Sequence, residues 1–333
     1  MIRQTGMPDC SPVQPALARC LVPLDPSDWR DKSQARLASL ARLLAEPIAR
    51  VTPEKLAGMF MIDQVIVTAR RPPNLQSFPE LATRIRGALG NVLAAMGPPV
   101  YARKDYGARP RAFDVLWRAL GQSESGDEIA KPLVIKADVR SDTVTVTASL
   151  FGLAGFWKPD VAAALVGALE DGIKLNDSGP VKVALPCLDL VHRRIAGFEP
   201  PPFTVREARL IFRTPLRLRA GRAEASSPAA LPIALLNRAV RIAPWQQMAI
   251  EMDWPAMHRA ARRIGVSGEL VPYRWERGSQ RMRKRIPVLG NLGAIVLRGD
   301  LDPFWPFLRI AENAHVGSHA ALGLGQFDLS LLP

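Results

Sequence analysis

The sequence is poor in the residues that build disulfide frameworks and zinc sites. Its 333 residues include three cysteines and four histidines, and the cysteines form no Cys-X-X-Cys pair. This composition excludes a disulfide-stapled scaffold and a cysteine-based zinc site. We therefore expect the protein in a reducing cytoplasm.

Long apolar runs are also missing. No stretch of 18 or more uninterrupted apolar residues occurs, so we expect no membrane-spanning helix. Residues 1–19 lack the charged start and apolar core of a secretory signal peptide. With 48% hydrophobic residues, the chain can still bury a sizeable core, which excludes a wholly disordered protein. Its length suits two compact domains.

Acidic residues are scarce in one third of the chain. The whole sequence has 44 Lys and Arg against 31 Asp and Glu, a formal net charge of +13. Residues 199–299 hold 18 of the basic and 7 of the acidic residues, and nearly every base there is Arg. A genome rich in G and C would favour Arg over Lys but would not cluster it. Because Arg grips phosphate bidentately and stacks on bases, the cluster predicts a surface for nucleic acid rather than for membrane.

Hydropathy patterns predict one order of strands and helices in the first half of the chain. The predicted elements are a strand over Met61–Ala69, a helix over Phe78–Met96, strands over Leu133–Val139 and Thr143–Leu150, a helix over Asp160–Ile173, and strands over Val181–Leu185 and Leu188–His192. This βαββαβ order is that of a ferredoxin-like domain.

The same order returns after the proline run Glu199–Pro202. The predicted elements are a strand over Thr204–Phe212, a helix from Pro232 to Ile242 closed by His258–Ile264, strands over Glu269–Arg277 and Arg283–Leu289 followed by Gly293–Leu297, a helix over Pro303–Ile310, and a strand over Gly325–Leu331. The predicted fold is therefore α+β, with tandem ferredoxin-like domains at 59–198 and 203–333. Residues 1–58 are expected to form a helical accessory region that ends near Glu46–Pro47.

The most specific segment of the sequence is His315–Gly325, with Gly317, Gly323 and Gly325 close before a strand. Backbone N–H groups in such a loop can converge on an anion. A nucleotide-binding fingerprint needs glycines between a strand and a helix, so the order here argues against one. The alternative is that the glycines only let a helix and a strand pack closely.

Short segments in a fixed order resemble a known family. They are Arg86–Gly90, Leu150–Gly152, Phe212–Leu218, Pro287–Ile295, and His315–Gly317 followed by Gly323–Gly325. In this order and spacing they are similar to the repeat-specific CRISPR-associated endoribonucleases. The resemblance spans residues 59–333.

The resemblance implies a function as well as a fold. It implies cutting of precursor CRISPR RNA at the 3′ base of the repeat stem-loop, by attack of a 2′-hydroxyl, with 2′,3′-cyclic phosphate and 5′-hydroxyl products. It implies no metal or other cofactor, a single turnover with retention of the mature RNA, and other CRISPR effector subunits as further partners. The alternatives are a non-catalytic RNA-binding subunit of an effector complex and a basic RNA-binding protein unrelated to CRISPR.

The sequence departs from the family pattern where proton transfer is concerned. Many members carry a histidine base in the first domain, but the first histidine here is His192. Where the family loop often has Lys-Gly, this chain has Ser318 and His319. The absence of the early histidine favours the non-catalytic alternative.

Three sets of residues compete for the catalytic role. The first is the loop histidines, of which His315 is expected to brace the loop and His319 is the more open candidate. The second is the basic, aromatic pair Lys104 and Tyr106. The third is Arg84 and Arg86 on the predicted helix Phe78–Met96, which would bend the RNA and stabilise charge on phosphate while a weak base suffices for one turnover.

RNA-binding residues are predicted in three places. A basic hairpin carries Arg274, Arg277, Arg281, Arg283, Lys284 and Arg285, and the resemblance implies that it inserts at the base of the stem-loop. Arg213, Arg217 and Arg219 alternate along one predicted strand and should share a face. The loop glycines Gly317, Gly323 and Gly325 complete the set. The alternative is that these arginines line solvated edges.

Overall fold

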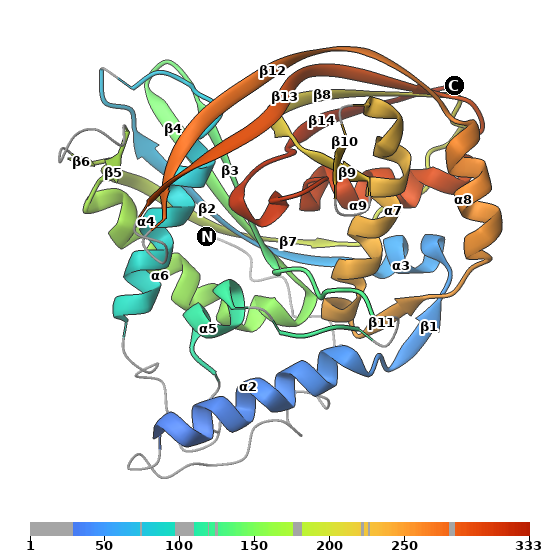
Figure 1. Cartoon of the computed structure of the whole chain (residues 1–333). Coiled ribbons are helices and arrows are strands. Elements are labelled where there is room, and N and C mark those ends of the chain that lie inside the picture. The colour runs from blue at the N-terminus through green and yellow to red at the C-terminus, as the bar shows by residue number, and fades with distance from the viewer. Residues whose placement is uncertain are drawn as a thin grey trace, which may run out of the picture.

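The computed structural model describes residues 29–73, 75–96, 110–118, 120–123, 126–175, 182–220, 223–225, 227–279 and 284–333. The first domain is an antiparallel sheet with two helices on one face (Figure 1). Its elements are β2 Met61–Arg70, α4 Leu81–Ala95, β3 Leu133–Val139, β4 Thr143–Phe151, α6 Lys158–Glu170 and β7 Cys187–Ala196. The strand order β3-β4-β2-β7 is that of a ferredoxin-like fold.

The second domain repeats this plan. Its sheet and helices are β8 Glu207–Leu216, α7 Leu231–Ile242, β12 Gly265–Ser279, β13 Lys284–Arg298, α9 Trp305–Ala314 and β14 Phe327–Leu332. The strand order β12-β13-β8-β14 corresponds strand for strand to that of the first sheet. The predicted tandem ferredoxin-like architecture is therefore confirmed.

Apolar periodicity explains the faces that these elements bury. Leu81, Ile85 and Leu89 recur at four-residue spacing on α4 and are all buried. On β2, the alternating Val65, Val67 and Ala69 are buried as well.

Several predicted boundaries are wrong in the second domain. Of the predicted segment Arg283–Leu289, the described residues 284–289 belong to the same strand, β13, as Gly293–Leu297. The interruption is a register shift against β8 between Asn291 and Gly293. Gly293 has a φ of +140°, and a Cβ there would lie 2.0 Å from the carbonyl oxygen of Glu269, so a β-bulge lies between the two predicted segments. His258–Ile264 does not extend α7. It lies in and just after a separate helix, α8 (Trp254–Arg263), behind a 3₁₀ turn and strand β11 (Met248–Ile250).

Two boundaries also differ in the first domain. The second helix ends at Glu170 rather than Ile173, because Gly172 adopts a left-handed φ of +88°. In the described part of the predicted strand Val181–Leu185, residues 182–185, Lys182–Val183 forms a strand (β6), which pairs with β5 (Ile173–Lys174). The edge strand β7 begins after Pro186.

The N-terminal region is helical, as predicted, over α2 (Trp29–Ala45) and α3 (Pro53–Met59). Between these helices, β1 (Ala49–Val51) pairs in parallel with β11 of the second half. The Gln247 side chain donates a hydrogen bond of 3.1 Å to the carbonyl of Leu43. The accessory region is thus tied to the second domain. Residues 1–28 lie outside the described residues.

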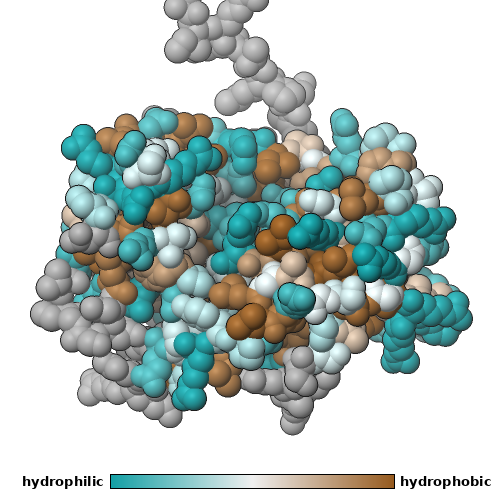
Figure 2. Space-filling model, turned by 90° about the horizontal axis from the view of Figure 1, so that it is seen from above, coloured by the Kyte–Doolittle hydropathy of each residue, from teal (hydrophilic) through white to brown (hydrophobic). Residues whose placement is uncertain are grey.

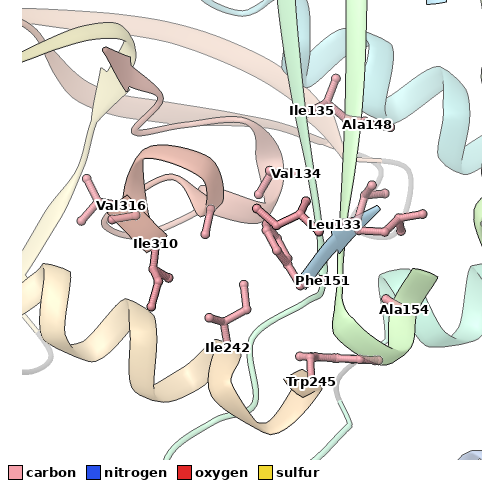
Figure 3. Packing of buried hydrophobic residues seen from close by; sticks show 14 of the residues in the cluster. Leu133, Val134, Ile135, Ala148, Phe151, Ala154, Ile242, Trp245, Ile310 and Val316 are labelled. Atoms are coloured by element: carbon pink, nitrogen blue, oxygen red, sulfur yellow. The ribbon is translucent and has the colours of Figure 1, made fainter. Parts of the chain in front are cut away.

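One hydrophobic core continues across both domains (Figure 3). Ile242 and Ile310 of the second domain face Val134 and Phe151 of the first. The Trp245 indole donates a hydrogen bond of 2.7 Å to the carbonyl of Ala130, which belongs to the first domain. Because this contact surface is apolar and closely packed, it fixes the two sheets relative to each other.

The second sheet turns its other face outward. Figure 2, which views the molecule from above, shows hydrophobic residues interspersed with hydrophilic ones. Val271 on β12 and Leu289 on β13 are exposed apolar residues of this sheet. No helix among the described residues is long and apolar enough to cross a membrane.

Candidate functional site

The glycine-rich loop, His315–Gly325, connects α9 to β14 and folds back onto the end of β8. The Val316 amide donates to the Gly325 carbonyl at 3.1 Å and closes the loop. The Ser318 amide donates to the Arg217 carbonyl at 2.7 Å, and the Gly325 amide donates to the Pro215 carbonyl at 3.0 Å. These three backbone hydrogen bonds therefore fix the conformation of the loop and its position against β8.

Glycine is required at two of these positions. A Cβ on Gly325 would lie 1.8 Å from the carbonyl oxygen of Val316, and one on Gly317 would lie 2.5 Å from that of Arg217. Both glycines also have positive φ angles, of +66° and +85°. These glycines therefore do allow close packing, which is the alternative that the sequence left open for them. The close packing brings the backbone of the loop next to Arg217.

The loop also docks on the first domain. The Thr83 hydroxyl, in the first turn of α4, donates a hydrogen bond of 2.7 Å to the carbonyl of Leu322. A Cβ on Gly323 would lie 3.1 Å from the Cβ of Ala82. The N-terminal turn of α4, which carries Arg84, therefore borders the loop.

The hairpin of β12 and β13 reaches the same place (Figure 1). Trp275 and Val288 from the hairpin are buried with Leu324 of the loop, and Tyr273 and Leu322 pack against this cluster. The rings of Tyr273 and Trp275 lie 5.8 Å apart. Three segments that are distant in sequence, the hairpin, the loop and α4, thus meet at one junction.

Tyr273 lies at this junction with two charged residues of the first domain. Its partial burial raises the pKa of the phenol to about 12, and the nearby Glu80 carboxylate acts in the same direction. Arg84 opposes the shift. Glu80, directly before α4, is itself buried. Neither Tyr273 nor Glu80 was among the site residues predicted from the sequence.

The loop's exposed histidine is oriented by an arginine. His319 is exposed and has a left-handed φ of +64°. Its Nδ1 lies 3.1 Å from the Arg217 guanidinium. Because Arg217 can only donate, Nδ1 accepts, and the neutral ring then carries its proton on Nε2. In this tautomer the Nε2–H of His319 is a hydrogen-bond donor.

His315 is fully buried, with no exposed surface. Burial lowers its pKa well below the ordinary value, and the cations Lys136 and Arg238 act in the same direction, so the ring is neutral. Neither ring nitrogen makes a well-aligned hydrogen bond among the described residues, although backbone groups of Ala320 and Leu324 lie beside the ring. This position fits the bracing role predicted for His315 rather than proton transfer to a ligand.

A buried arginine and a half-buried lysine hold the helix end from which the loop starts. The Arg238 guanidinium donates two hydrogen bonds, of 3.0 and 2.7 Å, to the carbonyl of Ala314. The Lys136 ammonium, from the first domain, donates one of 2.9 Å to the carbonyl of Glu312. Cations at the carboxyl end of a helix complement its dipole. Both domains therefore help to position the loop.

The two α4 arginines do not act together as expected. Arg84 borders the junction, but Arg86 is 5% exposed, with its guanidinium 4.3 Å above the Trp117 ring. Residues two apart on a helix point about 200° from each other, which separates these two side chains. Buried against Trp117, Arg86 does not join Arg84 at the junction, which corrects the expectation that both arginines act on the RNA. Lys104 and Tyr106 lie outside the described residues.

The predicted face of Arg213, Arg217 and Arg219 is also corrected. The strand is not continuous, because β8 ends at Leu216 and β9 (Leu218–Ala220) pairs instead with β10 (Ala223–Ala225). Arg213 is exposed and donates a hydrogen bond of 2.6 Å to Asp328. Arg219 is exposed on β9, so only Arg217 meets the loop.

The hairpin arginines are described in part. Arg274 is exposed on β12. The backbones of Arg277, Lys284 and Arg285 lie in the paired strands, whereas the places of their side chains lie outside the described structure. Arg281 and Arg283 lie outside the described residues. Within the part of the chain that the structure describes, no group of three or more His, Cys, Asp or Glu residues is placed to hold a metal ion.

Comparison with solved structures finds similar proteins at low sequence identity. A Cas6 product complex is 15% identical, with 83% of this chain and 100% of that chain covered and a TM-score of 0.48. Thermus thermophilus Cas6 is 14% identical, with 81% and 99% covered and a TM-score of 0.48. A RAMP protein binding different RNA substrates is 12% identical, with 82% and 100% covered and a TM-score of 0.44. None of the curated proteins matches the chain.

A family model carries the assignment. The model described as CRISPR-associated endoribonuclease Cas6 matches residues 210–327. This range begins in β8, ends in β14 and includes the hairpin and the glycine-rich loop, so it confirms the resemblance expected from the sequence. Over its second domain, the chain is thus similar to the Cas6 family of CRISPR-associated endoribonucleases.

Proposed function

We propose that the protein is a metal-independent endoribonuclease that cuts precursor CRISPR RNA at the 3′ base of the repeat stem-loop and retains the mature RNA. The family assignment supports the reaction class. The observation that carries the proposal is the junction itself, where Arg217 and His319 of the second domain lie beside the first turn of α4 and the base of the basic hairpin.

The chemistry requires stabilisation of charge that develops on the phosphate. As the 2′-oxygen attacks, negative charge grows on the non-bridging oxygens of the phosphate. The Arg217 guanidinium and the Nε2–H of His319 are adjacent donors that fit this charge. Arg84, whose charge acts on Tyr273 at the junction, would supply a third cation. Held in this tautomer, His319 serves as a donor and not as a base, so the 2′-hydroxyl proton passes to water.

The hairpin contributes binding. A-form RNA has a deep, narrow major groove, so arginines grip phosphates and the open end of the stem. Arg274 is exposed on the strand that packs onto the loop. A stem held along the hairpin would therefore end at the junction, which places the phosphate at the stem's 3′ base beside Arg217 and His319.

A single-turnover cleavage assay in EDTA tests the proposal. Purified protein in excess is incubated with labelled repeat RNA, with the same RNA carrying one 2′-deoxy nucleotide at the expected cut, and with a hairpin of scrambled sequence. We expect cleavage of the repeat alone, lost on the 2′-deoxy substitution. Tight repeat binding without cleavage would instead support a non-catalytic subunit, and equal binding of the scrambled hairpin would support a general RNA-binding protein.

A further inference from the structure

We propose that Tyr273 is the general acid of the reaction, donating its phenolic proton to the 5′-oxygen that leaves the phosphate; this assignment rests on the proposed function. It supplies a proton donor to a chain whose first histidine is His192.

The packing of the hairpin places Tyr273 beside the phosphate-binding donors. Tyr273 pairs across the hairpin with Gly290. A Cβ on Gly290 would lie 2.7 Å from the Cβ of Pro215, so the hairpin crosses the end of β8 in close contact, two residues before Arg217. Arg217 in turn orients His319. Tyr273 therefore lies on a hairpin that packs against β8 two residues before Arg217.

The orientation of the phenol ring is restricted by its neighbours. The ring lies beside that of Trp275 on its own strand. It packs against the cluster that Trp275 forms with Leu324 of the loop, on which Leu322 also packs. Tyr273 remains partly exposed, so its hydroxyl can reach a bound ligand. Glu80 and Arg84 of the first domain lie near this hydroxyl, and one carboxylate oxygen of Glu80 is buried without a hydrogen-bond partner among the described residues.

The electrostatic surroundings suit a donor rather than a base. Burial and the Glu80 carboxylate raise the pKa of Tyr273 to about 12, so the phenol keeps its proton at neutral pH. A departing 5′-alkoxide is more basic than a phenolate, so proton transfer to it is favourable. Arg84 lies close enough to stabilise the phenolate that remains.

The step balances without a metal or redox partner. The bond from the 2′-oxygen to phosphorus forms while the bond from phosphorus to the 5′-oxygen breaks. The 2′-hydroxyl proton passes to water, and the Tyr273 proton passes to the 5′-oxygen. Water then reprotonates the phenolate, leaving a 2′,3′-cyclic phosphate and a 5′-hydroxyl.

The test combines Tyr273→Phe with a substrate that needs no acid. In this RNA a sulfur atom replaces the bridging 5′-oxygen at the cut, and the resulting thiolate departs without protonation. We expect Tyr273→Phe to slow single-turnover cleavage of ordinary repeat RNA by about 100-fold or more, with repeat affinity unchanged. On the sulfur-bridged RNA the variant should cleave at the wild-type rate.

Trp275→Phe is the matched control, since it changes the same aromatic cluster without touching the hydroxyl. Any effect of this variant should be equal on the two substrates. A Tyr273→Phe defect of the same size on both substrates, or wild-type cleavage of ordinary RNA by this variant, would overturn the role of Tyr273 alone. Wild-type protein that binds the repeat but cuts neither substrate in EDTA would overturn the proposed function and this role together.

Discussion

The hydroxyl of Thr83, in the first domain, donates a hydrogen bond of 2.7 Å to the carbonyl of Leu322, in the glycine-rich loop of the second. This contact joins the two halves of the junction on which the proposed function depends. The domains are also locked by an apolar core, so the hydrogen bond positions the loop locally rather than holding the domains together.

Thr83→Val should therefore reduce cleavage more than stability. A hydrogen bond of this kind contributes about 1 kcal/mol, so a loosened loop should slow single-turnover cleavage by about five-fold. The melting temperature should change little. Thr145→Val on β4 is the control, because it makes the same chemical change in the first sheet away from the loop. Equal cleavage rates for the two variants and the wild type would show that the hydrogen bond between Thr83 and the loop does not contribute to cleavage.

Buried His315 should make the protein sensitive to acid. Burial, together with Lys136 and Arg238, holds the pKa of His315 well below its ordinary value of 6.5. Below about pH 6.5 the unfolded chain therefore binds a proton that the folded protein does not. The contribution of neutral His315 to the free energy of unfolding is fully present above that pH. It is lost as the pH drops toward the lowered pKa, by up to about 1.4 kcal/mol per pH unit.

Urea unfolding at a series of pH values measures this effect. His315→Gln should lower stability at neutral pH but show a shallower loss toward acid than the wild type. His192→Gln, at an exposed position on β7, is the histidine control and should keep the wild-type slope. The same acid slope in His315→Gln and wild type would contradict the neutral, buried state of His315.

Arg217 and His319 are expected to act as a unit on the phosphate. His319→Ala and Arg217→Met should each slow cleavage by about 10-fold to 100-fold. The double variant should be little slower than the worse single variant, because Arg217 also orients His319. Single-turnover rates at saturating protein measure the cycle. Fully additive effects on the cleavage rate would show that the two residues act independently. An unchanged cleavage rate in His319→Ala would show that His319 is not part of the site.

The hairpin is expected to provide electrostatic affinity for RNA. Replacing Arg281, Arg283 and Lys284 with Gln should weaken repeat binding and flatten its salt dependence. The slope of log affinity against log salt concentration should become shallower by about 0.9 for each RNA phosphate that the variant no longer neutralises. Binding titrations at several salt concentrations measure both quantities.

The control removes the same charge elsewhere. Arg259, Arg262 and Arg263 are exposed on α8, and their replacement with Gln should leave the salt slope of repeat binding close to that of the wild type. Repeat affinity that survives removal of the hairpin charges, or falls equally in both variants, would contradict RNA binding by the hairpin.

The element order was predictable because each strand and helix carries its own periodic apolar pattern. Breaks that depend on contacts with other elements were not. The sequence around Gly293 predicted two strand segments, yet they are one strand, β13, with a bulge. The break at Arg217 arises where the glycine-rich loop folds onto the end of β8.

The site was predictable only in its local parts. The glycine-rich loop and the basic hairpin have sequence signals, and the position of Arg84 on the first helix was also foreseen. The burial of Arg86 under Trp117 and the meeting of Tyr273 with Glu80 depend on tertiary packing between distant segments. The different roles expected for His315 and His319 came from the family resemblance, whereas the burial of one and the exposure of the other are set by packing.

The ends of the product test the central claim most directly. Repeat RNA is cut by the wild-type protein in EDTA, and the upstream fragment is weighed by mass spectrometry before and after treatment with acid. Attack by the 2′-hydroxyl predicts a 2′,3′-cyclic phosphate that acid opens with the gain of one water, at the nucleotide on the 3′ base of the stem. An upstream fragment ending in a 3′-hydroxyl, or a cut elsewhere in the repeat, would contradict the account.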